Sequence, residues 1–182
     1  MKGICGWFGE QAVTDSGSEE AAVLAGLIAA GAQAAAATEG TLHCAGLHGT
    51  VFAAGEGQAG GRPAGAELTY SDDGLAVLLS DTTSLGGAAA VAAAYRADPE
   101  GFLDRLHGPF ALAIAEPGRL LLAIDRAGAR PLYVLEHRGA IWFASRLAAL
   151  TAVPGFAPRI DDKALFDYLY FQMVPSPGTI YR

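Results

Sequence analysis

The stretch PFALAIAEPGRLLLAI, residues 109–124, contains the pattern on which the fold prediction rests. Two apolar runs, 109–115 and 120–124, flank the tetrapeptide Glu116-Pro117-Gly118-Arg119. Proline presets φ at the first central position of a turn, and glycine accepts a positive φ at the second. The stretch therefore predicts two antiparallel strands joined by a tight turn.

Similar patterns recur along the chain. Strands are expected at 4–8, at 42–54 as two strands broken at His48-Gly49, at 75–79 after a turn at 71–74, and at 132–135 and 141–143 around a turn at 137–139. Helices are expected from Ser18 to about Ala37, at 88–96, at 101–106 and at 161–171, the last capped by Asp161 or Asp162. Hairpins with helices grouped between them indicate an α+β fold. Periodicity alone does not distinguish two facing sheets from one covered sheet.

Composition excludes several classes of protein. The chain has 182 residues and a mass of 18.6 kDa, the length of one domain. It is 52% hydrophobic and 17% charged, which excludes a disordered chain. A net charge of −7 without a basic cluster argues against nucleic-acid and anionic-membrane partners. Two cysteines, Cys5 and Cys44, are too few for a disulfide framework, and no Cys/His cluster predicts a metal site.

One segment imitates a membrane or signal sequence. Residues 21–38 are uncharged and contain Ala-Gln-Ala at 32–34. Their alanines and glycines gain little from transfer into lipid, and the preceding Asp15, Glu19 and Glu20 replace the basic cluster of a signal peptide. We therefore expect neither a spanning nor a targeting role, and a cytoplasmic protein.

Three later segments resemble a known family. They are LDRLHGPFA at 103–111, IDRAGARPLY at 124–133 and FASRLAAL at 143–150. In this order and spacing they resemble the N-terminal glutamine amidotransferase domain of asparagine synthetase-like enzymes. The N-terminal Gly3-Ile4 and Gly6-Trp7-Phe8 fit the same family, as does the tail 160–182, and the resemblance is strongest from residue 101 onward.

The resemblance implies a class II amidotransferase of the N-terminal-nucleophile type: a four-layer α/β-β/α sandwich of two antiparallel sheets. Residues 1–172 would form this domain, and residues 173–182 would begin the linker towards a synthetase domain outside the chain. Family members hydrolyse glutamine and pass ammonia to that domain, which uses ATP. ATP and Mg are thus expected only in the synthetase partner, with no cofactor in this domain; a homodimer is also compatible.

The family's nucleophile is a cysteine directly after Met1, whose free α-amine takes the thiol proton. If the chain is aligned so that Gly3, Ile4 and Gly6-Trp7-Phe8 match the family's pattern, Lys2 stands at the position of the nucleophile, and lysine has no thiol. In a second register, Cys5-Gly6-Trp7-Phe8-Gly9 supplies the nucleophile, provided that residues 1–4 are removed. We favour the first register because it retains more of the pattern, in which case Cys5 is a small buried hydrophobe.

The family's substrate-binding residues are also replaced. Where it carries Asn-Gly-Glu after a strand, this chain has Ser80-Asp81-Thr82-Thr83, although Asp81 offset by one position could still serve. The family has an acid at the start of the next helix, and Gly87 stands at that position here. The family also has an arginine that pairs with the glutamine carboxylate, but residues 42–52 contain no arginine. A zwitterionic substrate requires charged partners in a desolvated pocket, so these replacements predict a lost glutamine site.

The scaffold residues of the family are retained at Asp125, Arg126, Arg130 and Tyr133. Their implied role is support of the core and of the face next to the synthetase. The alternative for Asp125 and Arg126, which we favour for Arg126, is a buried or half-buried structural ion pair with each other or with neighbours. The histidines are scattered, and solvated or capping roles are expected for them: His43, His48, His107 and His137.

Three functions follow as hypotheses. The leading one is a glutaminase-inactive amidotransferase-like domain that docks onto the ATP-dependent, amide-forming ligase of an asparagine synthetase-like enzyme. The second is an active glutaminase that supplies ammonia for asparagine biosynthesis, with Cys5 exposed by processing. The third is a stand-alone interaction module; a large exposed apolar patch near Val153–Phe156 or on the C-terminal helix would favour a missing partner.

Overall fold

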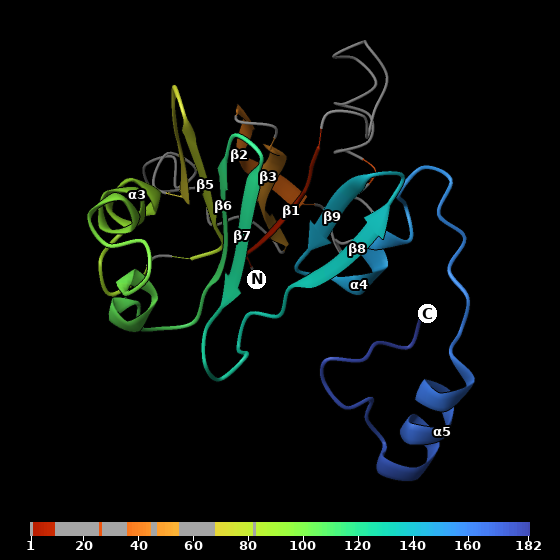
Figure 1. The fold of residues 1–182 in the computed structure, drawn as a ribbon. Helices are drawn as coiled ribbons and strands as arrows, with labels where there is room; N and C mark the ends of the chain where they lie inside the picture. The colour runs from red at the N-terminus through yellow and green to blue at the C-terminus, as the bar shows by residue number, and fades with distance from the viewer. Residues whose placement is uncertain (1, 10–25, 27–35, 45–46, 55–67, 82) are drawn as a thin grey trace.

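The chain contains two antiparallel β-sheets in the computed structural model, which describes residues 2–9, 26, 36–44, 47–54, 68–81 and 83–182 (Figure 1). The five-stranded sheet has the order β2-β3-β1-β9-β8, and the four-stranded sheet has the order β4-β5-β6-β7. The strands are β1 (Lys2–Phe8), β2 (Ala36–Cys44), β3 (Leu47–Ala54), β4 (Thr69–Asp72), β5 (Leu75–Leu79), β6 (Ala111–Glu116), β7 (Arg119–Ile124), β8 (Tyr133–His137) and β9 (Ala140–Ala144). The predicted α+β fold of two antiparallel sheets is confirmed.

The hairpin predicted at residues 109–124 is formed. β6 and β7 pair from Ala111↔Ile124 to Glu116↔Arg119, so Pro117 and Gly118 form the turn. Gly118 has a φ of 74°, a conformation that residues with a Cβ rarely adopt. Every residue of β6 except Glu116 is buried, because both faces of this strand are covered.

The main core fills the space between the two sheets and continues onto the outer face of the four-stranded sheet. Side chains alternate along β1, so that Ile4 and Phe8 belong to this core, together with Leu47 and Phe143 of the same sheet. Cys5 and Trp7 belong to a second, smaller cluster with Trp142. The two clusters lie on opposite faces of β1.

Helices cover the outer faces of the sheets (Figure 1). α3 (Ala88–Ala97) buries Ala88, Val91, Ala92 and Tyr95 in the main core and packs on β5 and β4. The Tyr95 hydroxyl donates to the Glu116 carboxylate at 3.0 Å. α4 (Leu147–Leu150) covers the second cluster with Ala149 and Leu150.

The C-terminal region forms a separate helix. α5 (Asp162–Phe171) follows an extended segment and projects beyond both sheets (Figure 1). The chain then returns, and Tyr181 pairs with Ile160 in an antiparallel bridge. Asp161 N donates to Ile180 O, and Arg182 N donates to Arg159 O, both at 3.0 Å. We call these paired segments, 159–162 and 179–182, the clasp. The linker expected to begin at 173–182 stays a prediction.

Several sequence-based boundaries were wrong. The break expected at His48-Gly49 lies elsewhere, because both residues are inside β3. Cys44 pairs with Leu47, so the chain reverses between Cys44 and Leu47. Residues 36–37 belong to β2 and not to a helix, and the rest of the helix expected from Ser18 lies outside the described residues, Gly26 aside. Residues 102–105 form a single 3-10 turn, η1 (Phe102–Arg105), within the helix expected at 101–106.

None of the helices that the structure describes combines the length and the apolar character needed to cross a membrane.

Candidate functional site

Cys5 lies in the interior of a strand with neighbours on both sides. It pairs with Thr50 of β3 and with Ala144 of β9, at the middle of the five-stranded sheet. Its side chain is fully buried among Trp7, Trp142 and Ala144 in the second cluster. Burial in this apolar surrounding raises the pKa of the Cys5 thiol to about 12. At neutral pH the group is therefore a thiol and not the thiolate that nucleophilic catalysis requires.

The residues before Cys5 are part of the same sheet. Ile4 is fully buried in the main core, and its N–H donates to Ser145 Oγ at 3.0 Å. Ser145 N donates in turn to Ile4 O at 2.8 Å. The nitrogen of Cys5 is thus held in a peptide bond inside a hydrogen-bonded strand. A peptide nitrogen cannot accept the thiol proton, unlike the free amine of an N-terminal residue.

The end of β5 carries the second group of predicted site residues. Ser80 N donates to Ala111 O at 2.9 Å, and Ala111 N donates to Ser80 Oγ at 2.8 Å. Asp81 accepts a hydrogen bond from Arg130 Nη2 at 2.9 Å, and both side chains are only partly exposed. The carboxylate that could serve as the family's substrate-binding acid, if offset by one position, is therefore already paired with a cation of the same chain.

Gly87 precedes α3, and the first turn of that helix contains no acidic residue. The structure therefore places no carboxylate where the family has its second acid. The described part of the chain does not include the side chains of Lys2, of residues 42–44, which contain Cys44, or of residues 49–52.

Asp125 organises the loop between β7 and β8. Its carboxylate accepts hydrogen bonds from four backbone N–H groups, those of Phe110 (3.4 Å), Ala127 (3.1 Å), Ala129 (3.0 Å) and Arg130 (3.1 Å). Although loss of solvent around the carboxyl pulls its pKa upwards, these four donors together hold the pKa of Asp125 below its ordinary value of 3.8. Asp125 is a fixed anion that positions Arg130 towards Asp81.

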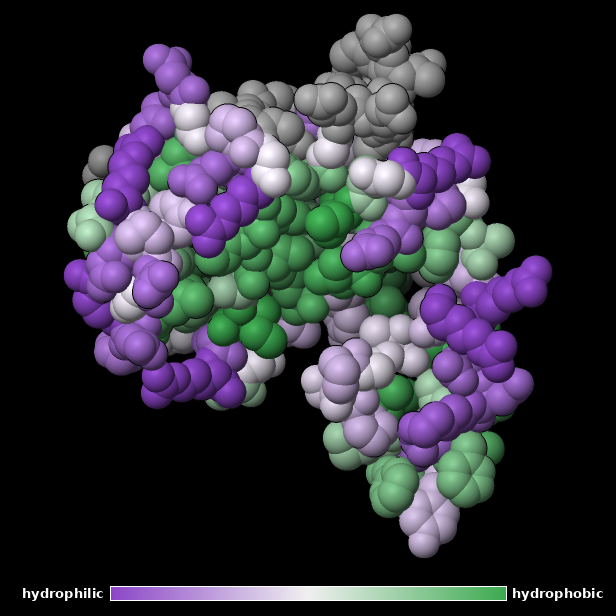
Figure 2. Space-filling view, viewed as in Figure 1, coloured by the Kyte–Doolittle hydropathy of each residue, from purple (hydrophilic) through white to green (hydrophobic). Residues whose placement is uncertain are grey.

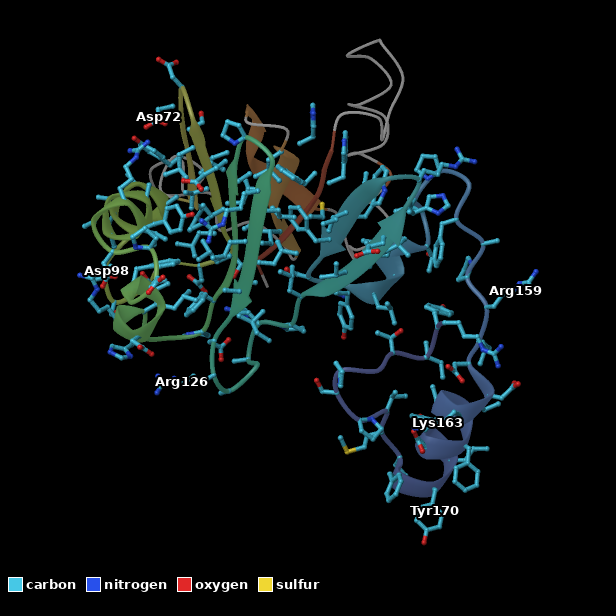
Figure 3. All side chains as sticks on the ribbon, viewed as in Figure 1. Asp72, Asp98, Arg126, Arg159, Lys163 and Tyr170 are labelled. Atoms are coloured by element: carbon cyan, nitrogen blue, oxygen red, sulfur yellow. The ribbon has the colours of Figure 1, made fainter. Side chains whose placement is uncertain are left out.

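Arg126 does not form the expected pair with Asp125. Its guanidinium donates to Asp104 at 3.0 Å, and its side chain is 90% exposed (Figure 3). The reason is that Asp125 is already occupied by backbone amides. Arg126 and Asp125 line an open hollow of about 440 Å³ that also includes His107 and Pro109.

Tyr133 lies at the other end of this loop, at the start of β8. It pairs with Ala144 and packs on the second cluster. His48, expected to be solvated or capping, instead stacks on Trp7 with ring centroids 5.1 Å apart. Sequence reasoning missed Ser80 and Ser145, each of which follows an apolar strand and ties it to a neighbouring strand. Among the described residues, no group of three or more His, Cys, Asp or Glu could hold a metal ion.

Comparison with known proteins identifies the family. A family model described as a glutamine amidotransferase domain matches residues 79–182, which include Asp81, Asp125, Arg130 and α5. The chain belongs to this family. The match begins at the last residue of β5 and covers the Asp125 loop and the paired Asp81 and Arg130.

The relatives are named as asparagine synthetases or putative asparagine synthetases. The chain is 34% identical over 102 residues to proteins of Mycobacterium bovis and Mycobacterium tuberculosis, each named a putative glutamine-hydrolyzing asparagine synthetase. It is also 34% identical over 90 residues to the glutamine-hydrolyzing asparagine synthetase 1 of Bacillus subtilis. The matches cover 53% and 48% of this chain but only 16% and 14% of the relatives. The protein is thus an amidotransferase domain of the kind found in asparagine synthetase-like proteins.

Proposed function

We propose that this amidotransferase domain does not hydrolyse glutamine and serves as the docking half of an ATP-dependent, amide-forming enzyme of the asparagine synthetase-like type. The observation that carries the proposal is the position of Cys5 inside β1, where it is buried and has residues on both sides.

The chemistry of amide hydrolysis supports the proposal. A thiolate must attack the carbon of the glutamine side-chain amide, a nearby base must take the thiol proton, and ammonia must leave. Cys5 has a thiol pKa of about 12 and a peptide nitrogen in place of an amine. Its side chain also faces the cluster covered by α4, where substrate has no access. The protonation state of the thiol, the lack of a nearby base and the lack of substrate access therefore all oppose glutamine hydrolysis at Cys5.

Substrate recognition supports the same conclusion. A glutamine molecule carries an α-ammonium group and an α-carboxylate, both of which need partners of opposite charge. Asp81 is engaged by Arg130, and removing either partner of a part-buried ion pair carries an energetic cost. Neither Gly87 nor the first turn of α3 supplies a further acid.

Ammonia release from glutamine by the purified chain tests the proposal. The Bacillus subtilis relative, whose name includes glutamine hydrolysis, is the positive control. We expect no ammonia above the enzyme-free blank, no change in Cys5→Ala, and an intact mass that includes residues 1–4. Neither should a glutamine-like electrophile label the folded chain.

The alternative, an active glutaminase with Cys5 as its first residue, predicts the opposite results. Processing would remove Ile4 from the main core and end its hydrogen bonds with Ser145. A species beginning at Cys5 that releases ammonia, with turnover abolished in Cys5→Ala, would establish that alternative and overturn the proposal.

A further inference from the structure

α5 is an apolar helix that buries almost nothing against the described part of the chain. Ala164 is its only buried residue. Phe166 is 63% exposed, and Leu169 and Tyr170 are each 72% exposed. Tyr170 points away from the two sheets at the tip of the helix (Figure 3). An isolated helix of ten residues is marginal in water, so its stability has to come from contacts that it makes elsewhere.

The exposed side chains form a continuous surface. Leu165, Phe166, Leu169 and Tyr170 follow the spacing i, i+1, i+4, i+5, which places them on one side of a helix; we call them the α5 stripe. The rings of Phe166 and Tyr170 stack with centroids 6.1 Å apart. The four residues of the stripe expose on the order of 500 Å² of side chain, taking roughly 200 Å² per large side chain.

This area is more than half of one side of a typical protein–protein interface, about 800 Å² per partner. Monomeric proteins rarely expose contiguous apolar patches larger than a few hundred Å² without a function for them. The surroundings of the stripe also match an interface, because aromatic residues at its centre are bordered by charged groups. Lys163 pairs with Asp167 at 2.9 Å, and Arg182 approaches Asp162 at 3.4 Å.

The C-terminal residues of the chain leave the stripe uncovered. The clasp binds the base of α5 through the Ile160–Tyr181 bridge and the contact of Arg182 with Asp162. Beside the clasp lies a cavity of about 160 Å³, lined by apolar residues of β8 and α4, by Glu136, and by Thr179, Tyr181 and Arg182 of the clasp. Figure 2 shows further apolar surface over β7, on the face of the molecule turned towards the viewer.

We propose that the α5 stripe is the seat of the synthetase partner, an inference that rests on the proposed docking function. Two findings select this occupant. The family match extends through α5 to residue 182, so the exposed helix belongs to the family-like region. The matched region is also only 14–16% of relatives named asparagine synthetases, in which such a region is physically joined to a much larger protein. The partner therefore presents an apolar face to the stripe.

Association with a synthetase-type protein from the same source tests this inference. Calorimetry of the 182-residue chain should show binding, and hydrogen exchange of residues 162–171 should slow in the complex. Leu169→Asp should weaken binding at least about 30-fold, the loss typical of a central apolar anchor. Leu85→Asp is the matched control, because Leu85 is exposed in the loop before α3 and should bind like the wild type. Far-UV circular dichroism checks that both variants are folded.

Three results would overturn the inference: a wild-type chain that does not bind the synthetase, a Leu169→Asp variant that binds as tightly as the wild type, or a homodimer that Leu169→Asp converts to a monomer. The last would show that a second copy occupies the stripe. Glutaminase activity is measured separately, so a chain that releases ammonia yet docks through α5 would contradict only the inactivity proposed above.

Discussion

α3 and α5 are both ten residues long, yet they differ in what holds them in place. α3 is built largely of alanine and has no side-chain cap, but it buries four residues and packs on β5. α5 contains leucine, phenylalanine and tyrosine, and its Asp161 cap accepts a hydrogen bond from Lys163 N at 2.8 Å, but it buries only Ala164. The helix with the larger apolar side chains is the one exposed. The composition of a helix determines which side chains it can bury. Whether they are buried depends on whether another element packs against the helix.

The largest expected effect is the difference in the free energy of unfolding between a variant with a new charge in α3 and one with a new charge in α5. Val91→Asp puts a carboxylate into the fully buried face of α3 and should lower the free energy of unfolding by more than about 4 kcal/mol. Leu169→Asp in α5 should change it by less than about 0.5 kcal/mol, as for other exposed sites. Urea denaturation of the two variants measures the difference. Equal losses would mean that α5 is part of the cooperative core.

A smaller effect is expected at Asp125, which belongs to the sandwich and not to α5. Asp125→Ala leaves four backbone N–H groups without their acceptor and should cost about 3 kcal/mol. Because the pKa of Asp125 is lowered in the folded chain, the unfolded chain binds more protons at low pH. The stabilisation is present above the ordinary value of 3.8 and is lost as the pH falls below it. The difference between wild type and variant should therefore shrink in acid; a pH-independent difference would argue against this role.

The Asp161 cap should act locally. Asp161→Ala removes the acceptor for Lys163 N and should cost α5 about 1 kcal/mol. Since α5 contributes little to the core, hydrogen exchange of residues 162–171 should accelerate while the thermal midpoint of the sandwich stays unchanged. Asp161→Asn, which keeps an acceptor oxygen, is the matched control. A lowered thermal midpoint in Asp161→Ala alone would show that the clasp supports the sheets.

The smallest effect concerns a surface ion pair that joins α3 to the turn between β4 and β5. The Arg96 guanidinium and the Tyr70 hydroxyl both donate to Asp72 and lower the pKa of that carboxyl to about 2. Arg96→Gln should raise the pKa of Asp72 towards 3.8 without reaching it, because Tyr70 remains. Tyr70→Phe should raise it less. NMR titration of the carboxyl carbon follows both changes, and an unaltered value in Arg96→Gln would mean that the pair does not persist in solution.

Local chemistry explains which parts of the fold could be predicted from the sequence. Pro117 and Gly118 determine the β6–β7 turn by their own backbone preferences, and the structure contains that turn. The β2–β3 reversal was misplaced because Gly46 and Gly49 are three residues apart and either suits a turn. Alternation along β1 decides which face Cys5 occupies, but the sequence does not reveal which cluster covers that face.

The candidate site depended on contacts between distant residues. Arg130 and Asp81 are 49 positions apart, so their pair could not be derived from spacing. Asp125 could be singled out by resemblance, but its role as an acceptor for four amides requires the folded loop. The exposure of α5 was also unpredictable, because its apolar residues have the periodicity of a buried face.

The clasp has a consequence for how this region can vary. Ile160 and Tyr181 are bridged neighbours, so the chain comes back to the point at which it set out along α5. Residues 161–180 are then an insertion whose two ends lie side by side, so its length can change without moving the residues that flank it. A helix one turn shorter or longer, or one bearing a different apolar pattern, could be exchanged here without re-routing either sheet. Partner choice could thus diversify at this helix while the sandwich stays the same.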